Sequence, residues 1–142
     1  VIDAAAIGTI GGTYLGNPVC CAASIATIKY MEDINLNEKA IAVSEIVKDR
    51  LLKLKAKCSA IGDVRGLGAM QGIEFVENND PNLPDAETVT LLMKACLKRG
   101  LILLNAGTNK NVIRILSPLV ISHELLNKGL DIIEEELLKI TN

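Results

Sequence analysis

Apolar side chains recur every three or four residues in three stretches of the chain, and this spacing indicates one buried face of an α-helix. Helices are predicted to begin after Asn35, Asp85 and Ser122, which are residue types favoured at helix N-termini. Asn35 is followed by Glu38, a pattern related to the capping box. The three apolar faces comprise Ala40, Val43, Val47, Leu51, Leu54 and Cys58, then Val89, Met93, Cys96 and Leu97, and finally Leu126, Leu130, Ile133, Leu137 and Ile140.

A fourth helix is predicted from Pro18 to about Asp33, with Asn17 as its N-cap. Its apolar residues cover most of the circumference instead of one face, which indicates a buried helix with close neighbours. Cys20 and Cys21 belong to this run of small side chains, and we interpret them as packing residues.

Strands are predicted where glycine interrupts the helical pattern and Val, Ile or Phe are frequent. The segment "IGDVRGLGAMQGIEF" predicts two strands, over 63–66 and 69–76, kinked at their glycines. "LILLNAG" predicts a buried strand over 101–107, and "VIRIL" predicts another over 112–116.

The predicted order is helix, helix, strand, strand, helix, strand, strand, helix. Consecutive strands joined by short turns favour antiparallel pairing. The expected fold class is therefore α+β, with a small, mostly antiparallel sheet covered by helices. The sequence lacks a GxGxxG or P-loop turn between a strand and a helix, so it carries neither nucleotide-binding fingerprint.

Composition supports a globular chain with an aliphatic core. The 142 residues are 49% hydrophobic and only 2% aromatic, and this length suffices for one domain. Fifteen basic and seventeen acidic side chains nearly balance, and the lack of aromatic side chains leaves little for nucleobases to stack on. We therefore expect no nucleic-acid partner.

The four cysteines show no CxxC spacing and the chain has one histidine, so neither a metal site nor a disulfide framework is expected. This cysteine usage favours a reducing, cytoplasmic location. No apolar run approaches the length of a membrane span, and no membrane partner is expected. The sequence does not begin with methionine and starts within a pattern, so we expect it to be a fragment of a longer protein.

Arg114 is the most unusual residue in the predicted strands because it interrupts the apolar run of "VIRIL". A guanidinium cannot lose its charge to escape burial, so it needs an anion or solvent. Arg114 either lies on the solvent face of an alternating strand or binds a carboxylate, since its fork of donors matches two oxygens.

The segment "GTIGGTYLGNP" places Gly11, Gly12 and Thr13 before the first predicted helix. Glycines let the backbone approach a ligand closely, and the threonine hydroxyl adds a donor, which would suit a phosphate. Glycine-rich turns before helices are also common without any ligand, so these residues alone leave both interpretations open.

Other polar residues carry weaker signals. Arg65 either guards a cleft or pairs with a surface carboxylate, and we favour the pairing. His123 has no nucleophile arranged nearby and is expected to be solvated. Asp33, Glu74 and Glu77 show no paired spacing for acid and base roles. No catalytic residue is assigned.

Three segments taken together, "GGTYLGNPVCCAASIATI", "IGDVRGLGAMQGIEF" and "RGLILLNAGTNKNVIRILSPLVIS", resemble the C-terminal part of class III pyridoxal-phosphate aminotransferases in order and spacing. The 4-aminobutyrate aminotransferases are the most similar branch. The resemblance covers essentially the whole chain. It implies that residues 1–34 lead out of a large cofactor domain and that residues 35–142 form the C-terminal small domain of fold-type I enzymes.

The resemblance also implies site residues. Gly12 and Thr13 would lie in a turn that reaches across a dimer interface, where Thr13 binds the phosphate of pyridoxal 5'-phosphate held mainly by the other subunit. Arg114 would bind the α-carboxylate of glutamate or 2-oxoglutarate. The implied partners are small amino and keto acids and a second copy of the chain, as a homodimer or higher homo-oligomer.

The resemblance has two departures. The family's cofactor-binding lysine, the aspartate on the pyridine nitrogen and the stacking aromatic residue lie upstream of the region matched, and no lysine here stands in the family's lysine motif. The isolated chain is therefore expected to be inactive. Ser117 stands where many relatives have a second proline before Pro118. This departure affects the expected substrate more than the expected family.

The implied reaction passes the amino group of 4-aminobutyrate to 2-oxoglutarate, giving succinate semialdehyde and glutamate. An alternative within the family is an aminotransferase for acetylornithine, ornithine or another ω-amino acid. An alternative of another class is a free-standing ligand-binding or interaction module.

Overall fold

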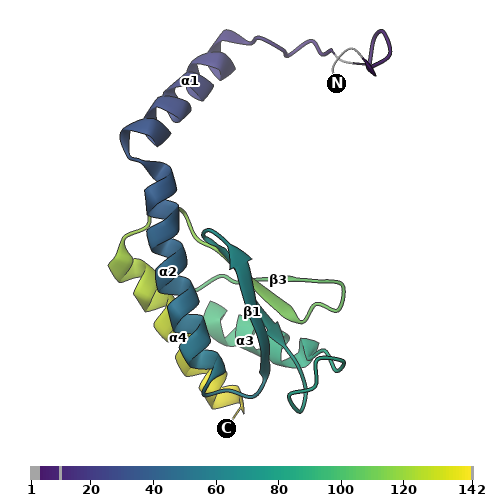
Figure 1. The fold of residues 1–142 in the computed structure, drawn as a ribbon, viewed down its shortest axis with the longest axis vertical. Helices are drawn as coiled ribbons and strands as arrows, with labels where there is room; N and C mark the ends of the chain where they lie inside the picture. Colours follow the sequence, from purple (N-terminus) through teal and green to yellow (C-terminus); the bar gives the residue numbers. More distant parts are fainter. Residues whose placement is uncertain (1–3, 10, 142) are drawn as a thin grey trace. The chain divides into compact units, whose positions relative to one another are not determined.

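The computed structural model describes residues 4–9 and 11–141. The chain divides into two compact units, one ending at Leu36 and the other beginning at Asn37. Helices and strands follow in the order α1, α2, β1, β2, α3, β3, β4 and α4 (Figure 1). This is the order that the sequence predicts, and the α+β class is confirmed.

Helix α1 (Pro18–Asp33) dominates the first unit. The side-chain oxygen of Asn17 accepts hydrogen bonds from the backbone N–H groups of Val19 at 3.0 Å and Cys20 at 3.3 Å, which confirms the N-cap. None of the residues of α1 is buried within this chain, so the burial expected for the helix, with Cys20 and Cys21 as packing residues, is not found in the chain by itself. The unit holds too few other residues to enclose a helix that is apolar on most sides.

Three helices belong to the rest of the fold: α2 (Leu36–Lys55), α3 (Ala86–Lys98) and α4 (His123–Thr141). The Asp85 carboxylate accepts from the Thr88 N–H at 2.8 Å, and the Ser122 hydroxyl accepts from the Leu125 N–H at 3.2 Å, so both predicted caps form. Asn35 has a φ of 51°, a left-handed conformation unlike the extended backbone of an N-cap. The predicted capping box is therefore wrong, although α2 does begin at the next residue. None of the helices within the described ranges is both long and apolar enough to cross a membrane.

The four strands form one antiparallel sheet in the order β1-β2-β4-β3. Their bounds are Ile61–Leu67, Met70–Phe75, Leu104–Ala106 and Val112–Leu116 for β1 to β4. The strand predicted over 101–107 is shorter than expected and is not buried, since Leu104 is 55% exposed. The reason is its position, because β3 lies at the sheet edge and pairs with β4 alone.

The hydrophobic core lies between one face of the sheet and the helices α2, α3 and α4 (Figure 1). Ile73, Ile113 and Ile115 turn to this face and are buried. Most of the predicted helix positions are buried with them, whereas Leu97 is 61% exposed and Leu92 takes its place in the core. The alternation along each strand therefore leaves the second face of the sheet outside the core.

Candidate functional site

Arg114 lies on the sheet face that the helices leave open. Its neighbours along β4, Ile113 and Ile115, are buried in the core, whereas Arg114 is exposed. Across the ladder Arg114 is directly opposite Gly72 of β2 on one side and Leu104 of β3 on the other. Directly opposite residues share a face of the sheet, so these three form one row across it.

The guanidinium of Arg114 has no carboxylate within 4.0 Å among the side chains that the structure describes. The other three arginines, Arg50, Arg65 and Arg99, each form ion pairs. Of the two interpretations left open by the sequence, solvent exposure is what the structure shows. An exposed guanidinium without an internal anion is also free to meet a carboxylate from outside the chain.

A cleft of about 550 Å³ adjoins Arg114, between the strand ends and α4. Its walls are mostly leucine and isoleucine side chains, and its polar lining residues include Arg99, Arg114, Ser117 and Lys128. The hydroxyl oxygen of Ser117 is buried and has no hydrogen-bond partner among the described residues. A mostly apolar cleft with a few polar groups is the usual form of a small-molecule site.

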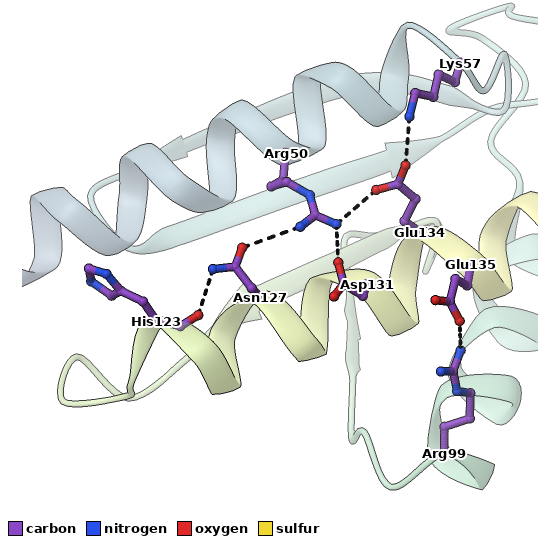
Figure 2. Close-up of polar contacts among 8 residues, drawn as sticks. All are labelled: Arg50, Lys57, Arg99, His123, Asn127, Asp131, Glu134 and Glu135. Carbon is purple, nitrogen blue, oxygen red and sulfur yellow. Dashed lines mark hydrogen bonds and ion pairs between the residues drawn. The ribbon is translucent and has the colours of Figure 1, made fainter.

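Ion pairs fix the helix that forms one wall of the cleft (Figure 2). Arg50 of α2 donates to Asp131 at 2.7 Å and to Glu134 at 3.0 Å, both on α4. Lys57 donates to the same Glu134 carboxylate at 2.9 Å. The hydrogen bonds from Lys57 and Arg50 lower the pKa of the Glu134 carboxyl, while its partial burial opposes the shift. A network of this kind holds α4 in place better than isolated surface pairs would.

A second set of charges ties α3 to α4. Arg99, at the end of α3, donates to Glu135 and Glu136, the latter at 3.1 Å (Figure 2 draws the Glu135 contact). Arg99 is also a lining residue of the cleft, so its guanidinium is already neutralised there. Arg114 is therefore the arginine of the cleft that has no internal partner in the described part of the chain.

Arg65 pairs with surface carboxylates, as the sequence predicts. It donates to Asp63 at 2.8 Å and also to Glu74. The hydrogen bond from Arg65 lowers the pKa of the Asp63 carboxyl, against a smaller opposing effect of burial. His123 is exposed at the first position of α4, and its carbonyl accepts from the Asn127 amide at 2.8 Å (Figure 2). The expectation that His123 is solvated is confirmed.

The turn that contains Gly12 and Thr13 belongs to the first unit, and Arg114 to the second. Backbone hydrogen bonds from Leu15 to the carbonyl of Gly12 and from Asn17 to that of Tyr14, both 3.3 Å long, shape this turn. A Cβ added to Gly11 would meet nothing within 4 Å, and Thr13 is exposed. Open backbone beside an exposed hydroxyl leaves room for a phosphate group, and no contact among the described residues requires glycine at position 11 or 12.

Two features of the site escaped sequence reasoning. The hydroxyl of Ser117 is buried without a hydrogen-bond partner among the described residues, and the sequence shows this position only as a serine where many relatives have a second proline before Pro118. The position of Gly72 opposite Arg114 depends on the strand register, which strand patterns alone do not give.

The model of the family "Aminotransferase class-III" matches residues 1–137. The chain is 44% identical over 137 residues to a probable 4-aminobutyrate aminotransferase of Bacillus subtilis, covering 96% of this chain and 31% of that protein. It is 46% identical over 135 residues to a 5-aminovalerate aminotransferase of Pseudomonas aeruginosa, covering 95% of this chain and 32% of that protein. Among solved structures, acetylornithine aminotransferase from Elizabethkingia anophelis aligns with a TM-score of 0.79 and 32% identity, over 98% of this chain and 34% of that one.

These comparisons agree on both the extent and the kind of similarity. The chain spans about a third of the length of the curated relatives that it matches. Class III aminotransferases depend on pyridoxal phosphate. Because the family model extends over nearly the entire sequence, the chain belongs to the class III aminotransferase family.

Proposed function

We propose that this chain is the C-terminal part of a pyridoxal-phosphate-dependent aminotransferase that passes the amino group of 4-aminobutyrate to 2-oxoglutarate. The observation that carries the proposal is Arg114, an exposed guanidinium with no carboxylate within 4.0 Å among the described residues, at the lining of an apolar cleft. Residues 1–34 would lead out of the cofactor domain, and residues 35–142 would form the small domain.

Arg114 is the residue that binds the α-carboxylate of 2-oxoglutarate or glutamate. Its planar fork of N–H donors meets both carboxylate oxygens, which orients the substrate as well as holding it. The cleft next to it has mostly apolar walls, so a substrate bound there would displace water, and electrostatic attraction is stronger where water is excluded.

4-Aminobutyrate lacks the carboxylate that Arg114 recognises, so this donor leaves the guanidinium without a partner. Arg114 is exposed within this chain, but where the rest of the protein and the substrate shield it from water, leaving the charge unpaired costs free energy. We propose that an acidic residue outside this chain covers Arg114 while 4-aminobutyrate is bound. The two amino donors therefore share a site but place different demands on one arginine.

The turn at Gly12 and Thr13 binds the cofactor phosphate. The glycines let backbone N–H groups approach the phosphate, and the Thr13 hydroxyl donates to one of its oxygens. When bound, pyridoxal phosphate supplies the electron sink for the reaction. The turn reaches the cofactor of a second subunit, so the active assembly is a homodimer or a higher homo-oligomer.

The test compares the two half-reactions in the full-length polypeptide that carries this segment. Arg114→Ala is expected to lower kcat/KM for 2-oxoglutarate by about 10- to 100-fold, the loss of a charge-assisted hydrogen-bond pair. The 4-aminobutyrate half-reaction should change far less. Stopped-flow absorbance of the cofactor follows each half-reaction separately.

Arg65→Ala is the matched control, because it removes another guanidinium from the same sheet face. It should leave the ratio of the two half-reactions unchanged. Equal losses in both half-reactions for Arg114→Ala would contradict the proposed role. The 142-residue chain alone is expected to show no turnover in the same assay.

A second candidate donor is 5-aminovalerate, because the relative of Pseudomonas aeruginosa that is named for it is 46% identical to this chain. 5-Aminovalerate is one methylene longer than 4-aminobutyrate and also lacks an α-carboxylate, so the role of Arg114 is the same for both. Initial rates of the full-length protein with 4-aminobutyrate, 5-aminovalerate, ornithine and acetylornithine would rank the donors.

A further inference from the structure

Gly72 lies inside β2, a central strand of the sheet, and no contact with the described residues requires a glycine there. A glycine in a strand interior weakens the strand, and it often marks a bulge or the close approach of a ligand or another backbone. The register irregularity of this hairpin lies between Ile61 and Asp63, away from Gly72. Gly72 also does not have a positive φ.

An added Cβ at Gly72 would lie 3.5 Å from Val112 Cγ1 and 3.6 Å from the carbonyl oxygen of Arg65, which are ordinary van der Waals distances. The two glycines of β1 differ. A Cβ at Gly62 would lie 2.7 Å from Val76 Cγ1, and a Cβ at Gly66 would lie 2.2 Å from the carbonyl oxygen of Met70. Internal packing explains those two glycines and leaves Gly72 unexplained.

The position of Gly72 supplies the explanation. It is directly opposite Arg114 on β4 and directly opposite Arg65 on β1, on the open face of the sheet. Cβ atoms of directly opposite residues in antiparallel strands are roughly 4.5–5.5 Å apart. A side chain at position 72 would therefore rest against the stem of Arg114, and its absence keeps the surface beside that guanidinium free.

We infer that Gly72 is a specificity-determining position for the carboxylate substrate: its bare backbone is the floor over which the carboxylate end of a short dicarboxylate lies when it binds Arg114. This inference rests on the proposed role of Arg114 and adds a size limit to it. A methyl group at position 72 makes only ordinary contacts within the chain. On this inference, a larger side chain would occupy the space of the ligand.

The experiment uses the full-length, cofactor-loaded polypeptide with Gly72→Leu, and with Ala106→Leu as its matched control. Ala106 is on the same face of the sheet but is paired with Val112 instead of Arg114. Two quantities are measured: the KM for 2-oxoglutarate, and the dissociation constant of glutarate by calorimetry. Glutarate is a dicarboxylate without an amino or keto group, so its binding reports the site independently of turnover.

Gly72→Leu is expected to raise both constants by about tenfold, the effect of overfilling a packed site, while Ala106→Leu changes them less than about twofold. The KM for 4-aminobutyrate should also change little. Unchanged glutarate binding in Gly72→Leu, or an equal weakening in both leucine variants, would overturn the inference. If Gly72→Leu does not fold, Gly72→Ala replaces it and is expected to weaken glutarate binding by about two- to threefold.

Arg114→Ala separates this inference from the proposed function. If Arg114→Ala leaves glutarate binding intact, the role of Arg114 is wrong and the role of Gly72 falls with it. If Arg114→Ala abolishes glutarate binding while Gly72→Leu does not weaken it, the inference about Gly72 alone is wrong.

Discussion

Substituting alanine for each of two glycines in the β1–β2 hairpin should have opposite effects on stability. At Gly66 the new Cβ would lie 2.2 Å from the Met70 carbonyl oxygen and 2.6 Å from Gln71 Oε1. One of these neighbours is backbone, so the hairpin itself must shift, and overpacking of this kind costs about 2 kcal/mol. At Gly72 the new Cβ makes ordinary contacts, and replacing a strand glycine gains about 0.5 kcal/mol through the unfolded state.

The two variants should therefore differ by about 2.5 kcal/mol in the free energy of unfolding. With a urea dependence of about 1.5 kcal/mol per molar, this corresponds to a gap of about 1.7 M between their unfolding midpoints. Urea titration followed by far-UV circular dichroism measures both midpoints on the 142-residue chain, and equal slopes would show that the same unit unfolds in each variant.

Equal destabilisation by Gly66→Ala and Gly72→Ala would refute this reasoning. It would mean that Gly72 has an internal structural role that the contact distances do not reveal. Gly72 would then have a structural reason within the chain, and its closeness to a ligand would no longer be needed to explain it. The stability measurement thus tests the premise of the inference about Gly72 without any cofactor or substrate.

Two further predictions concern Thr13 and Glu134. Thr13→Val in the full-length enzyme should weaken the binding of pyridoxal phosphate by about 1–3 kcal/mol, because it removes a hydrogen bond to a charged group. If the variant binds the cofactor as tightly as the unchanged enzyme does, Thr13 does not belong to the site. The hydrogen bond from Lys57 is the main cause that lowers the pKa of the Glu134 carboxyl from 4.5. The ion pair of Glu134 therefore contributes its full stability above about pH 4.5, and this contribution is lost as the pH falls through the lower pKa of the folded state. Urea midpoints of the chain and of Glu134→Gln, measured between pH 7 and 3, should draw closer as the pH falls below about 4.5, and a gap that stays constant over this whole range would contradict the linkage.

The sequence predicts an element well when the spacing of its apolar residues and its capping residue determine the structure locally. The stripe that includes Val47 and Leu51 and the stripe that includes Leu130 and Leu137 both lie in the core, because each helix buries one face against this sheet. The caps at Asp85 and Ser122 are equally local, since each side chain bonds a backbone N–H three residues later.

Prediction fails where the outcome depends on a neighbour that local sequence does not identify. Helix α1 has the composition of a buried helix, but its unit provides no partner to enclose it. Leu104 belongs to an apolar run, but it lies on an edge strand and on the open face. For the candidate site, the sequence could name Arg114 but could not place Gly72 beside it, because only the register brings the two together.

The alternation of β4 explains how one short strand can serve both the core and a ligand. Ile113 and Ile115 hold the strand against the helices, so the neighbouring face is free to carry a charge that the core could not accept. Substitutions at Arg114 or Gly72 should therefore act on carboxylate binding more than on folding, whereas substitutions at Ile113 should do the reverse. Substitutions on the open face of the sheet can therefore change which substrate binds, while the stability of the chain depends on the face that packs against the helices.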